Sequence, residues 1–379
     1  MIYLDNAATT KMYEGAYNKM LPYFRDVFAN PNASYSYAGD IRREIERVRL
    51  QIAESIGAKE EEIFFTSGGS ESDNWAIRGV AARTKKRHII SVVTEHHAVL
   101  NTLKDLEKEG FDITLLGVDK DGFINVDELK QAVRNDTALV TVMTANNEIG
   151  NIQPIAEIGE FLKVKDVIFH TDAVQAYGHI PIDVNIMGVD LLSASGHKFY
   201  GPKGVGYIYI RKGTDIAPLI TGGAQQDKMR AGTLNVPGII GMGEAAKYVG
   251  DNLRQNMLIE QEIRDYMITE ILEKVEGTFV NGSRLNRLPG NINICFPGVD
   301  GERLVSLLEH DGIICSNSAA CVEHGTEYSH VLKAIGVAPK DIKASLRITL
   351  SKDTSKEDVD YTVSKIVERV RLLRMVSDL

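Results

Sequence analysis

The apolar positions along the chain fall into short runs that alternate with longer amphipathic stretches. Six runs have the length and composition of strands buried on both faces: residues 61–67, 87–95, 111–118, 137–146, 165–173 and 189–196. Helical periodicity marks the stretches 41–57, 100–110 and 125–135. This alternation predicts an α/β fold with a mostly parallel sheet that is covered by helices.

The pattern changes after about residue 242. A long polar helical stretch covers 244–275, and strand-like runs follow at 291–299, 312–317 and 344–351. Thr354 and Glu357 match a capping box at the start of the last helix. We therefore expect two domains, a large α/β domain over 13–250 and a smaller α+β domain formed by 1–12 and 251–379.

Composition narrows the class of protein. The chain has 379 residues, of which 44% are hydrophobic, and its formal net charge of −9 argues against an electrostatic nucleic-acid binder. The apolar runs are too short to span a membrane, and the first residues show no charged-then-apolar signal pattern. The three cysteines have no C-x-x-C spacing, so we expect neither a disulfide framework nor a metal site. We expect a soluble cytoplasmic protein that contacts neither nucleic acid nor membrane.

Several polar residues directly follow the predicted strands. Gly69 and Ser70 lie in a loop of small residues before a helix, which suits a phosphate but also a simple capped turn. Asp172 ends a strand, where it could cap a helix or keep a heterocyclic nitrogen protonated. His96 ends another strand, where it could stack on a flat cofactor or be structural. Ligands of open α/β sheets bind at the carboxyl ends of the strands, so we expect these groups to converge there.

Lys198 has an unusual setting, because it stands where a strand gives way to a loop of small residues, "SASGHKFYGPKG". Exposed lysines usually lie on helix faces. A lysine beside a bound phosphorylated aldehyde forms a Schiff base when burial or neighbouring charge lowers its pKa. We interpret Lys198 as a residue that is held by small neighbours because a cofactor ring must lie against it.

The order of these motifs resembles the class V aminotransferase family, which has pyridoxal-phosphate fold type I and depends on pyridoxal 5′-phosphate. The motifs are "SGGSESDN", "TEHHAV", "NNEIG", "HTDAVQ", "SGHKFYGPKG" and "RAGTLNVPGI", and the likeness runs from "YLDNAATT" to "LRITLS". More narrowly, the chain resembles the cysteine desulfurases of the NifS/IscS kind. The resemblance implies a seven-stranded type of sheet in the large domain, and a homodimer.

The resemblance also implies a role for each residue that matches. Lys198 would carry the cofactor and move the Cα proton, Asp172 would pair with the ring nitrogen, and His96 would stack on the ring. Gln175 would meet the phenolic oxygen, and Thr233 would reach the phosphate bound by the partner subunit. The remaining phosphate contacts would come from Gly69, Ser70, Ser195 and His197. Asn147, which also counts among the cofactor-binding residues, would clamp the substrate carboxylate together with Arg347, whose fork geometry suits that task.

Cys321 stands where the family carries its sulfur-accepting cysteine, in the polar segment "CSNSAACVEHGTEYSHVL" of the small domain. A small buried residue is the simpler interpretation of such a cysteine, but the polarity of the segment favours an exposed nucleophile. Cys295 has the pattern of strand core, and Cys315 is ambiguous but closer to core. The sequence departs from the family pattern at four positions near the expected site: Ala33, Ser36, Asp227 and Asn317.

The function implied by the resemblance is conversion of L-cysteine to L-alanine, with transfer of sulfur to Cys321 as a persulfide. An acceptor protein would then take the sulfur for iron–sulfur cluster assembly or tRNA thiolation. Two alternatives remain: a selenocysteine lyase or another class V enzyme that makes no persulfide, and an inactive scaffold that only binds a partner. The joint presence of Lys198, Asp172, His96 and Arg347 argues against the scaffold.

Overall fold

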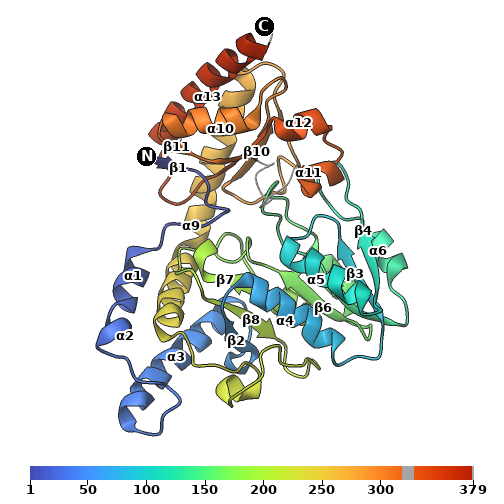
Figure 1. The fold of residues 1–379 in the computed structure, drawn as a ribbon, viewed down its shortest axis with the longest axis vertical. Helices are drawn as coiled ribbons and strands as arrows, with labels where there is room; N and C mark the ends of the chain where they lie inside the picture. Colours follow the sequence, from blue (N-terminus) through green and yellow to red (C-terminus); the bar gives the residue numbers. More distant parts are fainter. Residues whose placement is uncertain (318–327, 378–379) are drawn as a thin grey trace.

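The computed structural model describes residues 1–317 and 328–377, and it consists of a lower and an upper body (Figure 1). The lower body is built on a seven-stranded sheet with the order β2-β8-β7-β6-β5-β3-β4. Its strands are β2 (Ile63–Thr66), β3 (His88–Val92), β4 (Asp112–Leu116), β5 (Thr137–Thr141), β6 (Ile168–Asp172), β7 (Leu191–Ser195) and β8 (Gly206–Ile210). The six predicted strands are all present, and the sequence prediction of a mostly parallel α/β sheet is confirmed.

Two details of the large sheet differ from the prediction. The short run "GYIYI" forms β8, which is antiparallel to both β2 and β7 and was not predicted. It follows β7 without an intervening α-helix, so the strand–helix alternation gives no signal for it. In addition, β4 is not buried on both faces: Asp112 and Leu115 are exposed because β4 is the edge strand.

Helices cover both faces of the large sheet. On one face α4 (Gly69–Ala81) and α5 (His97–Lys108) bury an apolar layer that contains Trp75 and Leu103. On the other face the apolar layer draws on α3 (Ser36–Ser55), α6 (Val126–Ala132), α7 (Ile155–Leu162), α8 (Val184–Met187) and the first half of α9 (Val236–Lys274). Asn125 accepts hydrogen bonds from the backbone of Asp127 and Glu128, as a helix N-cap does.

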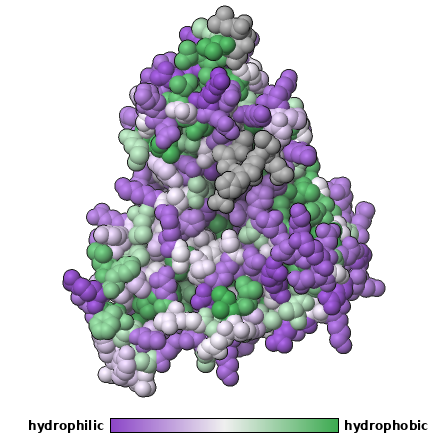
Figure 2. Space-filling model, in the orientation of Figure 1, coloured by the Kyte–Doolittle hydropathy of each residue, from purple (hydrophilic) through white to green (hydrophobic). Residues whose placement is uncertain are grey.

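The remaining elements of the lower body are short. They are the helices α1 (Glu14–Met20) and α2 (Pro22–Arg25) and the 3-10 turns η1 (Glu60–Glu62), η2 (Gly196–Lys198) and η3 (Gln225–Lys228). Exposed apolar side chains gather over α1 and α2, at the lower left of Figure 2, and include Leu21, Phe24 and Phe28. Within the described part of the chain, no helix is both long and apolar enough to cross a membrane.

The upper body is built on a smaller sheet with the order β12-β13-β10-β9. Its strands are β9 (Phe279–Val280), β10 (Asn291–Cys295), β12 (Ser316–Asn317) and β13 (Ser345–Thr349), and its helices are α10 (Gly301–His310), α11 (His330–Ala334), α12 (Pro339–Lys343) and α13 (Lys356–Ser377). A separate two-stranded pair links the start of the chain to the upper body, since β1 (Ile2–Tyr3) is parallel to β11 (Ile313–Ile314). The cap of α13 differs from the predicted pair: Ser355 and Asp358 hydrogen-bond each other's backbone N–H, in place of Thr354 and Glu357.

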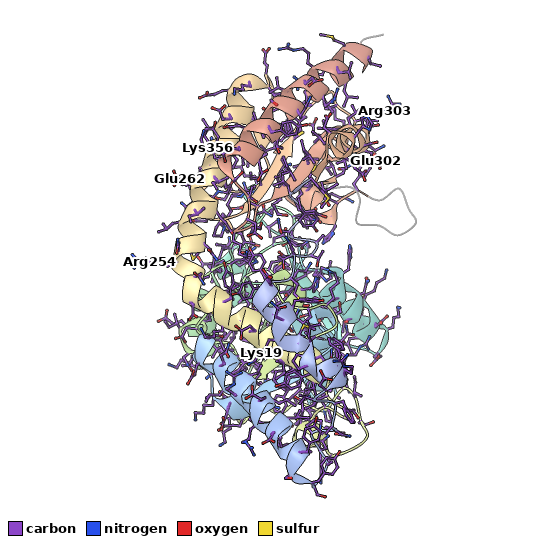
Figure 3. The ribbon with its side chains drawn as sticks, turned by 90° about the vertical axis from the view of Figure 1, so that its left-hand side faces the viewer. Lys19, Arg254, Glu262, Glu302, Arg303 and Lys356 are labelled. Atoms are coloured by element: carbon purple, nitrogen blue, oxygen red, sulfur yellow. The ribbon has the colours of Figure 1, made fainter. Side chains whose placement is uncertain are left out.

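One helix, α9, connects the two bodies. It is 39 residues long and continuous, so the predicted domain boundary at residue 250 falls inside it. Its charged residues Arg254 and Glu262 are exposed along the outer side of the molecule (Figure 3). Its first half packs in the core of the large sheet, and Met267, Ile268 and Ile271 pack in the core of the small sheet. Each of the two proposed domains therefore has its own apolar core, and α9 contributes residues to both cores.

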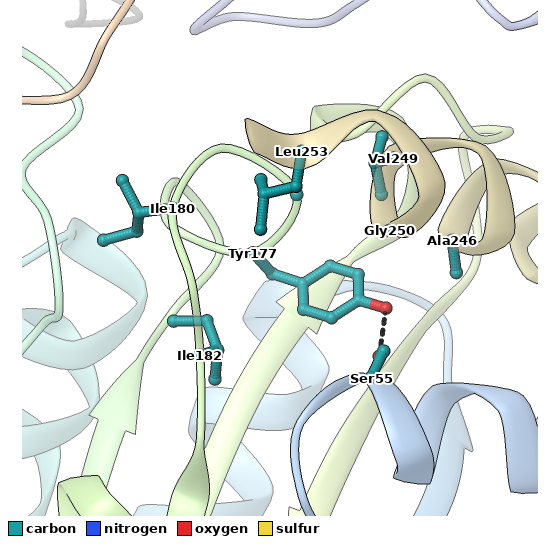
Figure 4. A pocket seen from close by; sticks show the side chains of 9 residues that line it. Ser55, Tyr177, Ile180, Ile182, Ala246, Val249, Gly250 and Leu253 are labelled. Atoms are coloured by element: carbon teal, nitrogen blue, oxygen red, sulfur yellow. Dashed lines mark hydrogen bonds between the residues drawn. The ribbon is translucent and has the colours of Figure 1, made fainter. Parts of the chain in front are cut away.

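A small cavity of about 30 Å³ lies where α3 and α9 meet the loop after β6 (Figure 4). Its walls are mostly apolar, and the hydroxyls of Ser55 and Tyr177 hydrogen-bond each other at 2.7 Å. Ser55 also donates to the carbonyl of Ile52. Both polar groups are thus satisfied by the protein itself, and the cavity is a packing gap between α3, α9 and the loop after β6.

The start of α4 depends on a glycine in the neighbouring strand. Gly206 in β8 lies against the carbonyl of Ala194 and the backbone of Gly68, so an added Cβ would come within 2.5 Å and 2.8 Å of these atoms. Gly68 has a φ of 152°, in the region that favours glycine. The two glycines therefore allow the loop before α4 to lie directly on the sheet.

We expect Gly206→Ala to lower the free energy of unfolding by about 1–3 kcal/mol, the usual cost of overpacking. Chemical denaturation measures this change. Gly117→Ala is the matched control, because a Cβ there meets nothing within 4 Å; it should change stability by less than about 0.5 kcal/mol. Equal effects of the two substitutions would contradict the close approach of β8 to Gly68.

Candidate active site

A cavity of about 320 Å³ lies at the carboxyl edge of the large sheet, next to the upper body. Most of the residues predicted from the sequence line it together: Gly69, Ser70, His96, Asn147, Asp172, Gln175, Ser195, His197, Lys198 and Arg347. Thr233 is exposed and does not line the cavity. Cys321 lies outside the described residues.

The fold explains why these side chains meet. Asp172 is the last residue of β6 and Ser195 the last of β7, and the two strands are parallel neighbours. His96 follows β3 and caps α5, while Lys198 ends the 3-10 turn directly after β7. Since parallel strands end at the same edge of a sheet, residues distant in sequence are brought to one place.

One corner of the cavity has the properties of an anion site. It contains the first turn of α4, whose N-cap residue Gly68 supplies no side-chain cap, so the backbone N–H groups of that turn lack this partner. Gly69 fits tightly, because a Cβ there would lie 2.6 Å from Val174 Cγ2. Ser70, Ser195 and His197 line the same cavity. Burial and the nearby Lys198 lower the pKa of His197 to about 4, so its ring is neutral at pH 7.

Asp172 is the central acid of the cavity. Its Oδ1 accepts a hydrogen bond of 2.8 Å from the backbone of Val174. Burial raises the pKa of Asp172 to about 6, although that hydrogen bond and Lys198 act in the opposite direction. At pH 7 the carboxyl group is therefore mainly ionised, and it becomes mainly neutral when the pH falls below about 6.

Two further buried carboxyl groups lie near Asp172 and were not predicted from the sequence. Asp73, on α4, lines the cavity, and its Oδ1 has no hydrogen-bond partner among the described residues. Glu95 accepts a hydrogen bond of 2.6 Å from the backbone of Met143. Burial and the charge of Asp172 raise the pKa of both groups well above the usual range. Asp73 gives no motif-level signal because an acid in the first turns of a helix is ordinary.

His96 presents a neutral ring to the cavity. Its Nδ1 accepts a hydrogen bond of 3.1 Å from the backbone of Ala98, which places the proton of the neutral ring on Nε2. Burial lowers the pKa of His96 to about 4, and Lys198 contributes in the same direction. A neutral, flat imidazole at this position is suited to the stacking role that the resemblance implies for His96.

A segment at the start of the chain forms one wall of the cavity, and we call residues 5–10 the N-terminal strap. Lys198 Nζ donates hydrogen bonds of 2.6 Å and 2.8 Å to the carbonyls of Ala7 and Ala8. Gln175 Nε2 donates to the same carbonyl of Ala7 at 2.9 Å, and Thr10 Oγ1 donates to the carbonyl of His197. The strap acts mainly through backbone carbonyls, so its role could not be derived from side-chain chemistry in the sequence.

Arg347 enters the cavity from the upper body. It lies on β13, and its side chain is 7% exposed. Its Nη2 donates to Asp5 Oδ1 at 2.8 Å, and its Nη1 donates to the carbonyl of Asn147 at 3.3 Å. The cavity thus combines an anion corner, a lysine, a buried acid and a guanidinium group, and the two bodies contribute to it jointly.

The other cysteines and the positions that depart from the family pattern lie elsewhere. Cys295 and Cys315 are both buried, and burial raises the pKa of each thiol to about 12, which makes them poor nucleophiles at neutral pH. Their sequence interpretation as core residues agrees with this. The departing residues Ala33, Ser36, Asp227 and Asn317 do not line the cavity.

Comparison with known proteins gives consistent results across the whole chain. The aminotransferase class-V family model matches residues 2–362. A cysteine desulfurase IscS from Dictyoglomus turgidum is 48% identical over 99% of this chain and 96% of its own length. A cysteine desulfurase IscS from Methanosarcina thermophila is 47% identical over 100% of this chain and 94% of its own.

Solved structures agree with the sequence comparisons. A NifS-like protein superposes with a TM-score of 0.92 at 36% identity, covering 98% of this chain and 99% of that one. SspA, solved in complex with cysteine, superposes with a TM-score of 0.83 at 35% identity, covering 93% of this chain and 99% of that one. The architecture is therefore that of the NifS-like structures, and the chain belongs to the aminotransferase class-V family.

Proposed function

We propose that the protein is a pyridoxal 5′-phosphate-dependent cysteine desulfurase, which converts L-cysteine to L-alanine and passes the sulfur to Cys321. The observation that carries the proposal is the convergence of Lys198, Asp172, Arg347 and the start of α4 on one cavity. The names of relatives that are 47–48% identical over nearly the whole chain support the same activity. We also propose that the enzyme is cytoplasmic, as the sequence analysis led us to expect.

The residues around the cavity fit the cofactor. The uncapped first turn of α4, the two serines and the neutral His197 form a donor set for a phosphate. Ionised Asp172 matches a protonated ring nitrogen, neutral His96 matches the face of the ring, and Gln175 lines the cavity near the lysine. Lys198 Nζ is held inside the cavity by two carbonyls, in reach of an aldehyde bound there.

The cofactor would supply an aldehyde that an amine can bind covalently, and a protonated ring that takes up an electron pair from Cα. Lys198 would hold the aldehyde of the cofactor when no substrate is bound, and its free amine would move the Cα proton of bound L-cysteine. Asp172 would keep the ring nitrogen protonated. Arg347 and Asn147 hold the substrate carboxylate, which aligns the Cα–H bond with Lys198.

Sulfur transfer requires a thiolate. The Cys321 thiolate attacks the sulfur of the bound substrate, an S–S bond forms as the Cβ–S bond breaks, and protonation of Cβ completes L-alanine. A sulfur-acceptor protein then takes the terminal sulfur of the persulfide.

We also propose a homodimer. Thr233 is exposed and lies outside the cavity of its own chain, so it is available to the cavity of a partner subunit.

Lys198→Ala should abolish both the visible absorption band of the loaded protein and the release of alanine, because no other lysine lines the described cavity wall. Absorption spectroscopy and alanine analysis measure the two effects. Lys203→Ala, an exposed lysine five positions further along the chain, is the control and should retain both. A Lys198→Ala protein that turns over L-cysteine at the wild-type rate would rule out the proposed role.

The affinity of the cofactor-free protein for pyridoxal 5′-phosphate should depend on Asp172. The carboxyl group is ionised above its pKa of about 6 and neutral below it, so affinity should fall as the pH drops through 6. The fall should approach about tenfold per pH unit. Equilibrium dialysis of wild type and Asp172→Asn over the same pH series isolates this contribution from the second ionisation of the phosphate, which also lies near pH 6. Identical pH profiles of the two proteins would show that Asp172 does not pair with the ring.

Cys321→Ser should bind the cofactor and L-cysteine normally but release almost no sulfur in the presence of a reductant, because a hydroxyl cannot form a persulfide. Sulfide and alanine assays measure the loss. Cys295→Ser and Cys315→Ser are the controls and should keep most of the activity, since both thiols are buried. If Cys321→Ser retained the wild-type rate, a lyase or an aminotransferase without a persulfide would replace the desulfurase.

A further inference from the structure

Asp5 and Arg347 form an ion pair in the wall of the cavity. Arg347 Nη2 lies 2.8 Å from Asp5 Oδ1, and the two side chains are 7% and 16% exposed. Asp5 belongs to the N-terminal strap, whereas Arg347 belongs to β13, so the pair joins segments that are 342 positions apart in the sequence. The sequence motifs gave Arg347 a role but gave none to Asp5.

The contacts of the guanidinium group show how it is oriented. Asp5 holds Nη2 and the carbonyl of Asn147 holds Nη1, while Nε is buried without a hydrogen-bond partner among the described residues. Each Nη carries a second N–H, so the guanidinium group keeps two further donors for a substrate carboxylate. The contacts with Asp5 and Asn147 therefore fix the orientation of the guanidinium group that the substrate carboxylate would meet.

Asp5 is itself fixed relative to Arg347. Thr349, two positions beyond Arg347 on β13, donates its N–H to the carbonyl of Leu4 at 2.7 Å and accepts from Ala7 N at 2.8 Å through its hydroxyl. Asn6 Nδ2 also donates to the carbonyl of Thr349 at 2.8 Å. The backbone on both sides of Asp5 is thus tied to the strand that carries the arginine.

Asp5 is the carboxylate in direct contact with this guanidinium among the described residues. Glu148 also lies within electrostatic reach of Arg347, but its Oε2 accepts a hydrogen bond of 2.5 Å from Ser329, and burial raises the pKa of Glu148. A buried arginine without a charged partner would be costly, and Asp5 removes that cost when no substrate is bound. A substrate carboxylate must therefore share the guanidinium with a carboxylate that is already there.

This sharing has a consequence for the reaction. L-cysteine and L-alanine carry the same α-carboxylate, so a tight grip on it would slow release of the product as much as it would aid binding of the substrate. We propose that Asp5 is a positioning residue that orients Arg347 and, through its negative charge, limits the affinity of Arg347 for the α-carboxylate so that the product amino acid can leave. The proposal rests on the proposed function.

The test compares two ligands and two charge states of residue 5. Calorimetry of the protein loaded with pyridoxal 5′-phosphate measures the affinity for L-alanine and for L-alaninamide, which lacks the carboxylate charge. Asp5→Asn keeps an oxygen acceptor and removes the charge, so affinity for L-alanine should rise about tenfold, the effect of losing one adjacent charge. Affinity for L-alaninamide should stay constant.

The decisive quantity is the affinity for L-alanine divided by the affinity for L-alaninamide. A change that only loosens the structure would weaken the binding of both ligands and leave this ratio unchanged. Asp5→Ser removes the same charge and must also raise the ratio, which covers the case in which Asp5→Asn folds poorly. Asp311→Asn is the matched control: its carboxylate pairs with Arg369 at 2.7 Å and does not line the cavity, so the ratio should not change.

An unchanged or lowered ratio in both Asp5 variants would overturn the proposal. With L-cysteine as substrate, Asp5→Asn should lower KM and make L-alanine a stronger product inhibitor by a similar factor. A wild-type protein that releases no sulfur from L-cysteine would contradict the proposed function, whereas the ratio for the two alanine ligands would still decide the role of Asp5.

Discussion

The cavity brings buried and half-buried cations and carboxyl groups close together, and the need to compensate each charge explains its arrangement. Lys198 faces two backbone carbonyls, Arg347 faces Asp5, and Asp172 accepts a backbone hydrogen bond. A charge that is buried without a partner either costs several kcal/mol or is lost through a pKa shift. The elevated pKa of Asp172 shows that compensation of this acid is incomplete in the chain alone. A cationic ring nitrogen beside it would complete the balance.

The two bodies contribute different kinds of groups to this balance. The large sheet supplies the anion corner and the acid from residues at strand ends, and these positions follow directly from parallel topology. The small sheet supplies Arg347, which lines the same cavity as Lys198, and hydrogen bonds tie its strand β13 to the strap. Substrate recognition by its carboxylate and chemistry at its Cα thus come from separate halves of the molecule.

Features that depend on side-chain chemistry or strand periodicity could be predicted from the sequence. The strand ends at Asp172 and Ser195, and the buried cysteines, are examples. Sequence reasoning missed β8, which is joined to β7 without an α-helix. It also chose Thr354 instead of Ser355 as the cap of α13, because both are followed by an acidic residue three positions later. Asp5 and Asp73 also escaped it. Their importance comes from distant partners, and one sequence without its fold gives no information on such pairs.

The start of the chain and a strand far along it belong to one structural unit. The first strand, β1, pairs with β11, and Asn6 and Ala7 hydrogen-bond Thr349 across more than 340 positions. A ribosome releases the first ten residues long before it has made β13, and contacts of such large separation form late in folding. During synthesis Lys198, Asp172 and the anion corner can therefore fold first. The strap takes its final position only after β13 has been made. The cavity is complete only when both the strap and β13 have been made, so its ability to hold a ligand depends on segments that are synthesised far apart in time.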